Sequence, residues 1–137
     1  MIEHLSFLEE KKFFLETLRV IKKGGIIRFS TVDFEKTIKL WLKAKDEWKD
    51  FHRDDENAIQ NQFWFGTYTY KPKNRWGYLA ATFYGSQNGK GQYHKNCYTK
   101  KKLISIFKHL NFIKTKVSEF RWQGKRDFMI RVISFKK

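Results

Sequence analysis

Two pairs of adjacent residues in this sequence combine side chains that can move a proton or hold a ligand. Glu3-His4 places a carboxylate beside an imidazole, and Tyr93-His94 places a phenol beside an imidazole just after the glycine-rich run Gly85–Gly91. Histidine has the side chain whose ordinary pKa lies nearest neutral pH, so His4 and His94 are candidate general bases or substrate-positioning groups. The alternative interpretations are a solvated chain end for Glu3-His4 and a surface position for His94.

Asp33 is a further candidate because it directly follows the apolar run Ile26–Val32. A carboxylate at the end of a strand can line a pocket at the sheet edge. The competing role is that of a helix N-cap, since a helical pattern follows and aspartate is a favoured capping residue.

Metal and phosphate motifs are not predicted. His52, His94 and Cys97 do not have the spacing of a zinc site, so we expect no metal. The run Gly85–Gly91 fits neither the P-loop nor the dinucleotide-binding fingerprint, so we interpret it as a flexible loop.

The first elements that position these residues are well marked. Ser6-Phe7-Leu8-Glu9 fits a capping box, which predicts a helix from about residue 7 to 22 with a left-handed stop at Gly24-Gly25. Ile26–Val32 is short, β-branched and apolar, which predicts a strand buried on both faces. Asp33 begins a second helix, whose apolar stripe contains Phe34, Ile38, Trp41, Leu42 and Trp48.

The middle of the chain is less regular than its two ends. Phe63–Tyr70 fits a strand or a helical turn, and the pattern does not decide between them. Pro72, Asn74 and Gly77 predict turns.

The C-terminal third again has clear signals. Thr99 is a good N-cap for a helix with Leu103, Ile106, Phe107 and Leu110 in its apolar stripe, and Asn111 can take the left-handed conformation at its end. Phe112–Phe120 and Phe128–Phe135 then predict two strands joined by an antiparallel return. A buried strand flanked by helices and followed by two strands predicts an α/β layer structure.

The composition of the chain limits the classes of protein to which it can belong. A chain of 137 residues that is 41% hydrophobic can form one domain with a core. Met1–Phe7 lacks the features of a signal peptide, and no stretch reaches the roughly 20 apolar residues needed to span a bilayer. The single cysteine, Cys97, cannot form an internal disulfide. These features favour a cytoplasmic protein without a membrane partner.

The formal net charge of +15 raises nucleic acid as a partner. Aromatic residues such as Trp64, Tyr68 and Tyr70 could stack on bases. Most of the basic residues are lysines spread along the chain, which favours solvated faces instead. A basic nucleic-acid-binding module is therefore the alternative function.

Several of these segments, in this order, resemble class I S-adenosylmethionine-dependent methyltransferases (methyltransferase type 11-like). In that family an acidic-His-Leu turn ends a strand, a helix ends in Arg-Val-Leu-Lys-Pro-Gly-Gly, and the fifth strand follows. Glu3-His4-Leu5, Leu18–Gly25, Ile27-Arg28 and Asp33 follow this pattern, with two substitutions in Leu18–Gly25.

The resemblance continues to the end of the chain. Tyr84-Gly85, Tyr93-His94-Lys95 and Tyr98-Thr99 resemble a run in which a His-Lys pair precedes Tyr-Thr and a helix. That helix ends in Gly-Phe in the family and in Asn111-Phe112 here. The two closing strands are similar to the family's final hairpin.

The resemblance implies a partial Rossmann-like sheet with the last three strands of the family and flanking helices. Residues 1–137 would be one truncated domain without the cofactor-binding half, so that Met1 interrupts a longer methyltransferase. Glu3 and His4 would then form the edge of the S-adenosylmethionine site, while Asp33, Tyr93 and His94 would line the substrate pocket. Trp64, Tyr68, Tyr70, Trp76 and Tyr84 would form a lid over it or pack in the core.

The same resemblance predicts an incomplete enzyme. No residue is assigned as the catalytic base, although His4 and His94 are candidates, and the methyl acceptor is not identified. The strand Ile26–Val32 would expose an unpaired edge. A complementing N-terminal half or a second copy of the chain could pair with that edge.

Overall fold

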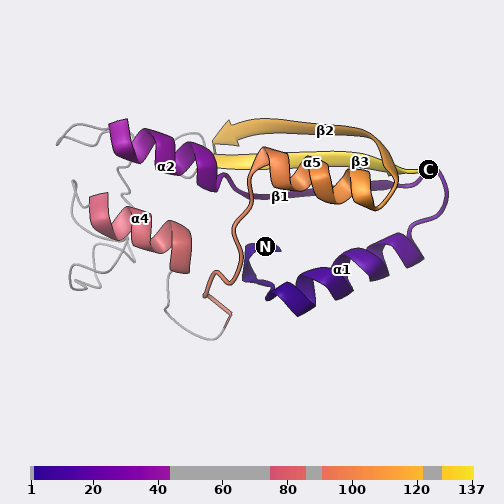
Figure 1. Cartoon of the computed structure of the whole chain (residues 1–137), viewed down its shortest axis with the longest axis horizontal. Helices are drawn as coiled ribbons and strands as arrows, with labels where there is room; N and C mark the ends of the chain where they lie inside the picture. Colours follow the sequence, from indigo (N-terminus) through magenta and orange to yellow (C-terminus); the bar gives the residue numbers. More distant parts are fainter. Residues whose placement is uncertain (1, 44–74, 86–90, 122–127) are drawn as a thin grey trace.

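The fold is described by a computed structural model that covers residues 2–43, 75–85, 91–121 and 128–137. Along the chain lie η1 (Ile2–His4), α1 (Phe7–Val20), β1 (Ile26–Val32), α2 (Phe34–Lys43), α4 (Arg75–Tyr84), α5 (Lys100–His109), β2 (Phe112–Arg121) and β3 (Phe128–Lys136) (Figure 1). The predicted mixed α/β architecture is confirmed, with three strands in one sheet and helices beside it.

The sheet has the strand order β1-β3-β2. The last strand pairs antiparallel with both neighbours, in registers that include Arg28↔Ile133 and Val117↔Val132. The predicted antiparallel pairing of the two final strands is therefore confirmed. Because β3 opposes both neighbours, β1 and β2 run parallel to each other. The connection between them contains α2, α4 and α5, as a crossover between parallel strands requires.

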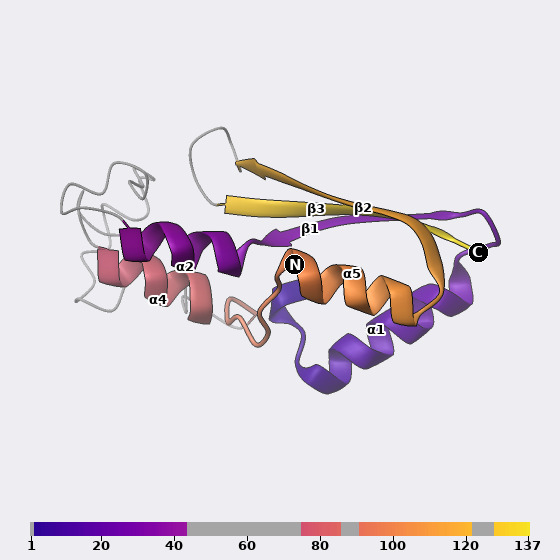
Figure 2. The same ribbon diagram turned by 45° about the horizontal axis from the view of Figure 1, so that its top comes forward.

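The core lies between the sheet and two helices that cover one of its faces, α1 and α5 (Figure 2). Buried side chains from every layer meet there, among them Phe14, Ile27, Leu103, Phe107, Ile130 and Val132. In the first half of β1, Ile27 is buried whereas Ile26 and Arg28 are exposed. The prediction that this strand is buried on both faces is therefore wrong for this half, because the described helices cover one face.

Local capping signals explain the helix ends. The Ser6 side chain accepts from the Glu9 amide and the Glu9 carboxylate accepts from the Ser6 amide, so the predicted capping box is confirmed. Helix α1 ends at Val20, two residues before the predicted end, because Ile21 is already extended. Gly24, with φ of 76°, serves the turn into β1.

The signals around α5 are also confirmed. The Thr99 hydroxyl accepts from the Lys102 amide at the helix start, and Asn111 has a φ of 58° just beyond the helix end. Strands β2 and β3 begin at the predicted residues, Phe112 and Phe128, and each extends one residue past its predicted end.

Two predictions in the middle of the chain are wrong. Gly77 lies within helix α4 and not in a turn, and Leu42 of the predicted apolar stripe is 69% exposed. The predictions for Trp48, Phe63–Tyr70, Pro72 and Asn74 fall outside the described residues. Among the described helices, none has the length and apolar character needed to cross a membrane.

Candidate functional site

Glu3 is held at the carboxyl end of β1. The Thr31 hydroxyl donates a 2.7 Å hydrogen bond to Oε2 of Glu3. Glu3 is buried, with only 5% of its surface exposed. The Glu3 carbonyl also accepts from the backbone amides of Lys95 and Asn96, at 2.7 and 3.1 Å. Glu3 is therefore anchored to the sheet and to a distant segment, which contradicts its interpretation as a solvated chain end.

The two candidate histidines meet beside Glu3. The His4 and His94 rings lie edge to face with their centroids 4.8 Å apart. Nδ1 of His4 is 3.0 Å from the Tyr93 carbonyl oxygen, and Nδ1 of His94 is 2.7 Å from the Thr82 carbonyl oxygen. We call Glu3, His4 and His94 the histidine cluster.

A close backbone approach positions His94. The His94 amide donates to the Tyr84 carbonyl at 3.1 Å, and Gly85 forms an isolated bridge with Tyr93. Gly85 has a φ of +78°, and a Cβ there would lie 1.8 Å from the carbonyl oxygen of Gln92. A side chain at this position would displace the segment that carries His94, so glycine is required.

Burial lowers the pKa of the His94 imidazole, and the nearby His4 acts in the same direction. The hydrogen bond to the Thr82 carbonyl and the charge of Glu3 oppose this change without cancelling it. The net change favours the neutral form of the imidazole. Because a carbonyl oxygen can only accept, Nδ1 carries the proton and Nε2 carries a lone pair.

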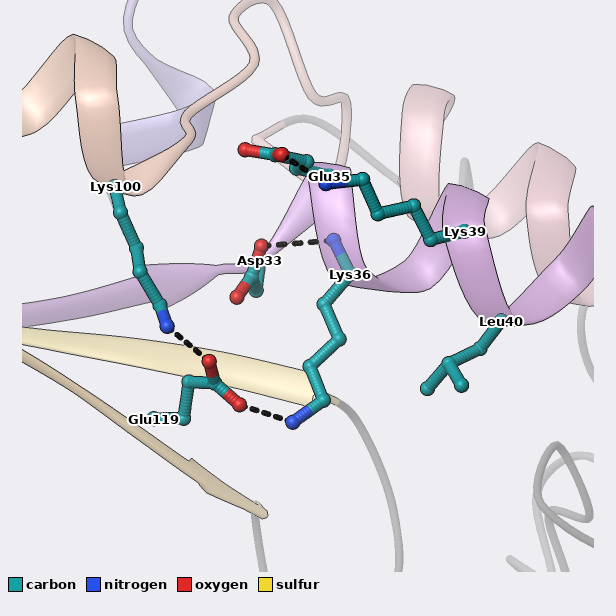
Figure 3. Close-up of a pocket in the computed structure, with 7 residues that line it drawn as sticks. All are labelled: Asp33, Glu35, Lys36, Lys39, Leu40, Lys100 and Glu119. Atoms are coloured by element: carbon teal, nitrogen blue, oxygen red, sulfur yellow. Dashed lines mark hydrogen bonds and ion pairs between the residues drawn. The ribbon is translucent and has the colours of Figure 1, made fainter.

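Asp33 lies in a separate pocket of about 310 Å³, shown in Figure 3. The pocket is lined by Asp33, Glu35, Lys36, Lys39, Leu40, Lys100 and Glu119, and we call it the charged pocket. Oδ1 of Asp33 accepts from the Lys36 amide at 3.0 Å, so Asp33 caps α2 while it lines the pocket. Burial raises the pKa of Asp33, partly opposed by this hydrogen bond, and Glu119 raises it further.

Ion pairs join the three lysines of the charged pocket to two carboxylates. Glu119 pairs with both Lys36 and Lys100, and so joins β2 to α2 and α5 (Figure 3). Lys39 pairs with Glu35 on the same helix. Hydrogen bonds from Lys100 and Lys36 lower the pKa of Glu119 to about 2.

The structure brings Glu3, His4 and His94 together, and places Asp33 in the charged pocket. Tyr93 contributes its backbone carbonyl to the histidine cluster, while the residue is 50% exposed. Of the aromatic residues predicted as a lid, Tyr84 is 62% exposed on α4. Trp64, Tyr68 and Tyr70 lie outside the described residues, as does His52.

The roles of Thr31 and Glu119 are not among the predictions made from the sequence. The sequence holds a signal for Thr31, because it follows the apolar residues Ile27 and Phe29 along one face of a strand predicted to be buried. A buried hydroxyl needs a hydrogen-bonding partner, which pointed to a polar group packed on the sheet. Glu119 carried no such signal, because its two partners lie on other elements.

The chain matches no protein-family model, and no curated protein or solved structure is detectably similar to it. Its function must therefore be inferred from the arrangement of these side chains.

Proposed function

We propose that these residues form the C-terminal, substrate-side portion of a class I S-adenosylmethionine-dependent methyltransferase. The observation that carries the proposal is the hydrogen bond between Thr31 and Glu3. This bond fastens the Glu3-His4 turn to the carboxyl end of β1. In open α/β sheets, ligands bind at the carboxyl ends of the strands.

The sheet supports the same assignment. Strands β1, β2 and β3 would correspond to the fifth, sixth and seventh strands of the family, whose last two strands form a hairpin. Here β2 and β3 are antiparallel, and β1 and β2 run parallel on either side of β3. The carboxyl ends of β1 and β2 therefore lie at one edge of the sheet, with the histidine cluster and the charged pocket.

The histidine cluster would serve the methyl acceptor. Methyl transfer requires a nucleophile held in line with the sulfonium methyl group, and an acceptor hydroxyl or amine gives up a proton. A neutral His94 with a lone pair on Nε2 can accept that proton. His4, whose ring contacts that of His94, would orient the acceptor.

Binding of the cofactor requires strands that these residues do not contain. The sequence has no Gly-rich turn of the kind that approaches a nucleotide cofactor. In the proposal, a cofactor-binding half pairs with the side of β1 that faces away from β3, where the described residues place no strand, and completes the site.

The charged pocket does not favour the alternative of nucleic-acid binding. Phosphate recognition needs cations available to the ligand, whereas Lys36, Lys39 and Lys100 are each paired with a carboxylate. A nucleic-acid module would reveal itself by binding single-stranded DNA with an affinity that falls steeply as salt rises.

A chimera tests the proposal. The first four strands of a class I methyltransferase, with their helices, are joined to Ile2, and binding of S-adenosylhomocysteine is measured by calorimetry. We expect the folded chimera to bind and the 137-residue chain alone not to bind.

Two matched variants accompany the chimera. Glu3→Gln in the chimera should weaken binding, whereas His109→Gln, an exposed position on α5, should not. A folded chimera that does not bind contradicts the assignment to the family. Tight binding by the chain alone contradicts the need for a second half.

A further inference from the structure

The histidine cluster joins three potential metal ligands from segments far apart in the sequence. One ligand atom from each of Glu3, His4 and His94 can be chosen so that all three lie within 4.8 Å of one another. Glu3 is buried, while His4 and His94 are half-buried, so the cluster lies at the surface with its carboxylate on the inner side.

Both imidazoles are held in the orientation typical of metal-ligating histidines. Nδ1 of His4 lies against the Tyr93 carbonyl and Nδ1 of His94 against the Thr82 carbonyl. Because carbonyl oxygens only accept, both Nδ1 atoms are donors, which leaves Nε2 of each ring as the nitrogen that can bind a metal ion. Histidines that bind metals usually donate their other ring nitrogen in this manner, which fixes the tautomer and the ring.

The Glu3 carboxylate is also held in place by a hydrogen bond. Thr31 donates to Oε2 of Glu3, so the side chain is oriented by a hydroxyl from β1. A hydrogen-bonded carboxylate is a usual partner for two imidazoles in a metal site.

We propose that Glu3, His4 and His94 bind a divalent transition-metal ion, with Zn²⁺ as the representative ion. Imidazole ligands favour Zn²⁺ and similar ions over Mg²⁺ or Ca²⁺, which prefer oxygen. Ligand atoms around a tetrahedral Zn²⁺ lie about 3.3 Å apart, given bond lengths of about 2.0–2.1 Å. The ligand atoms, which lie within 4.8 Å of one another, would therefore have to move closer together when the ion binds.

Two imidazoles and a carboxylate leave at least one coordination position open. Catalytic zinc sites combine three protein ligands with a water or substrate in this way, whereas structural sites are closed by four protein ligands. The open position accepts an oxygen or nitrogen donor, so the ion would bind and polarise a small polar ligand at the carboxyl edge of the sheet. This inference does not depend on methyl transfer, and it replaces the role of His94 as proton acceptor, because the Nε2 lone pair cannot bind the ion and accept a proton at the same time.

Calorimetric titration of the metal-free chain with Zn²⁺ tests the site. We expect one Zn²⁺ per chain, with binding weakened roughly tenfold or more by His4→Gln and by His94→Gln. The matched control is His109→Gln, which changes an exposed histidine of α5 and should leave the affinity unchanged. Absence of binding, or equal affinity in all variants, overturns the proposal.

A second measurement needs no variant and remains decisive if a substitution prevents folding. Co²⁺ is added to the wild-type chain, and paramagnetic broadening is mapped by NMR. Broadening should centre on the His4 and His94 rings and reach Thr31. Broadening centred on His52 or His109 overturns the proposal.

Discussion

At the scale of single residues, Thr31 is the residue that connects the sheet to the candidate site. It is fully buried, and its hydroxyl donates to a carboxylate that is itself buried. A hydrogen bond to a charged group contributes more to stability than one between neutral groups. Thr31 therefore supports both the stability of the fold and the position of Glu3.

Replacing Thr31 by valine keeps the shape of the side chain and removes the donor. We expect Thr31→Val to lower the free energy of unfolding by about 1.5–3 kcal/mol, measured by urea denaturation. Thr31→Ser keeps the hydroxyl and loses one methyl group, so its loss should be smaller, about 1 kcal/mol. A valine variant as stable as the serine variant would show that the hydrogen bond contributes little.

At the scale of elements, two features position β2. One is the C-terminal end of α5, and the other is the pair of ion pairs that Glu119 makes with α2 and α5. Asn111 ends the helix in a left-handed conformation, which leads the chain into β2. Glu119 then holds the far part of β2 against α2 and α5 through Lys36 and Lys100.

Substitution of Asn111 tests the helix end. Only glycine adopts a positive φ without a steric penalty, and asparagine tolerates it better than other residues. We expect Asn111→Ala to destabilise the protein by about 1 kcal/mol and Asn111→Gly to have little effect. Thermal and urea unfolding of both variants measure this difference, and equal stability of the two would contradict the conformational argument.

The ion pairs of Glu119 predict an acid-sensitive contribution to stability. Lys100 and Lys36 lower the pKa of Glu119 from 4.5 to about 2. Because the pKa is lower in the folded state, the ionised Glu119 carboxylate stabilises the fold above pH 4.5. This stabilisation is lost as the pH falls toward 2. Stability should therefore decline across this range, and the Glu119→Gln variant should decline less.

NMR titration provides the direct check on this argument. The side-chain carbon signal of Glu119 should titrate near pH 2 in the wild type. It should titrate at higher pH in Lys100→Met, which removes one of the two cations. An unchanged titration in Lys100→Met would mean that Lys100 does not hold this carboxylate in solution.

At the scale of the whole molecule, the sheet order makes β3 the interior strand and β1 an edge. An edge strand presents backbone groups that no neighbouring strand within the sheet satisfies, and such an edge favours pairing with another chain. Among the described residues, no strand pairs with the side of β1 that faces away from β3, and the proposed function places the pairing with a further chain segment there.

Amide hydrogen exchange tests this arrangement. We expect the amides of Met129–Phe135 to exchange slowest, because β3 is paired on both sides. Along β1, slow and fast exchange should alternate, since every second amide points away from β3. Uniform protection of β1 that depends on protein concentration would instead indicate that copies of the chain pair through this edge.

The elements could be predicted from the sequence because their signals are local. A capping box at Ser6, an N-cap at Thr99 and a left-handed position at Asn111 act over a few residues, and each is found where the sequence places it. The sequence does not predict helix α4, because Asn74 and Gly77 are interpreted as turn signals and the mostly apolar run Arg75–Tyr84 shows no clear helical period. Asn74 and Gly85, which flank this run in the sequence, are nevertheless residue types typical of helix caps.

The sequence alone determined which residues could do chemistry and which local elements carry them, because side-chain type and capping depend on near neighbours. Only the tertiary structure decided that His4 meets the Tyr93-His94 segment, since their contact spans 89 residues. That contact requires the close backbone approach at Gly85 and the anchoring of Glu3 to Thr31. The place of β3 between β1 and β2 was likewise decided by long-range pairing, which no local pattern specifies.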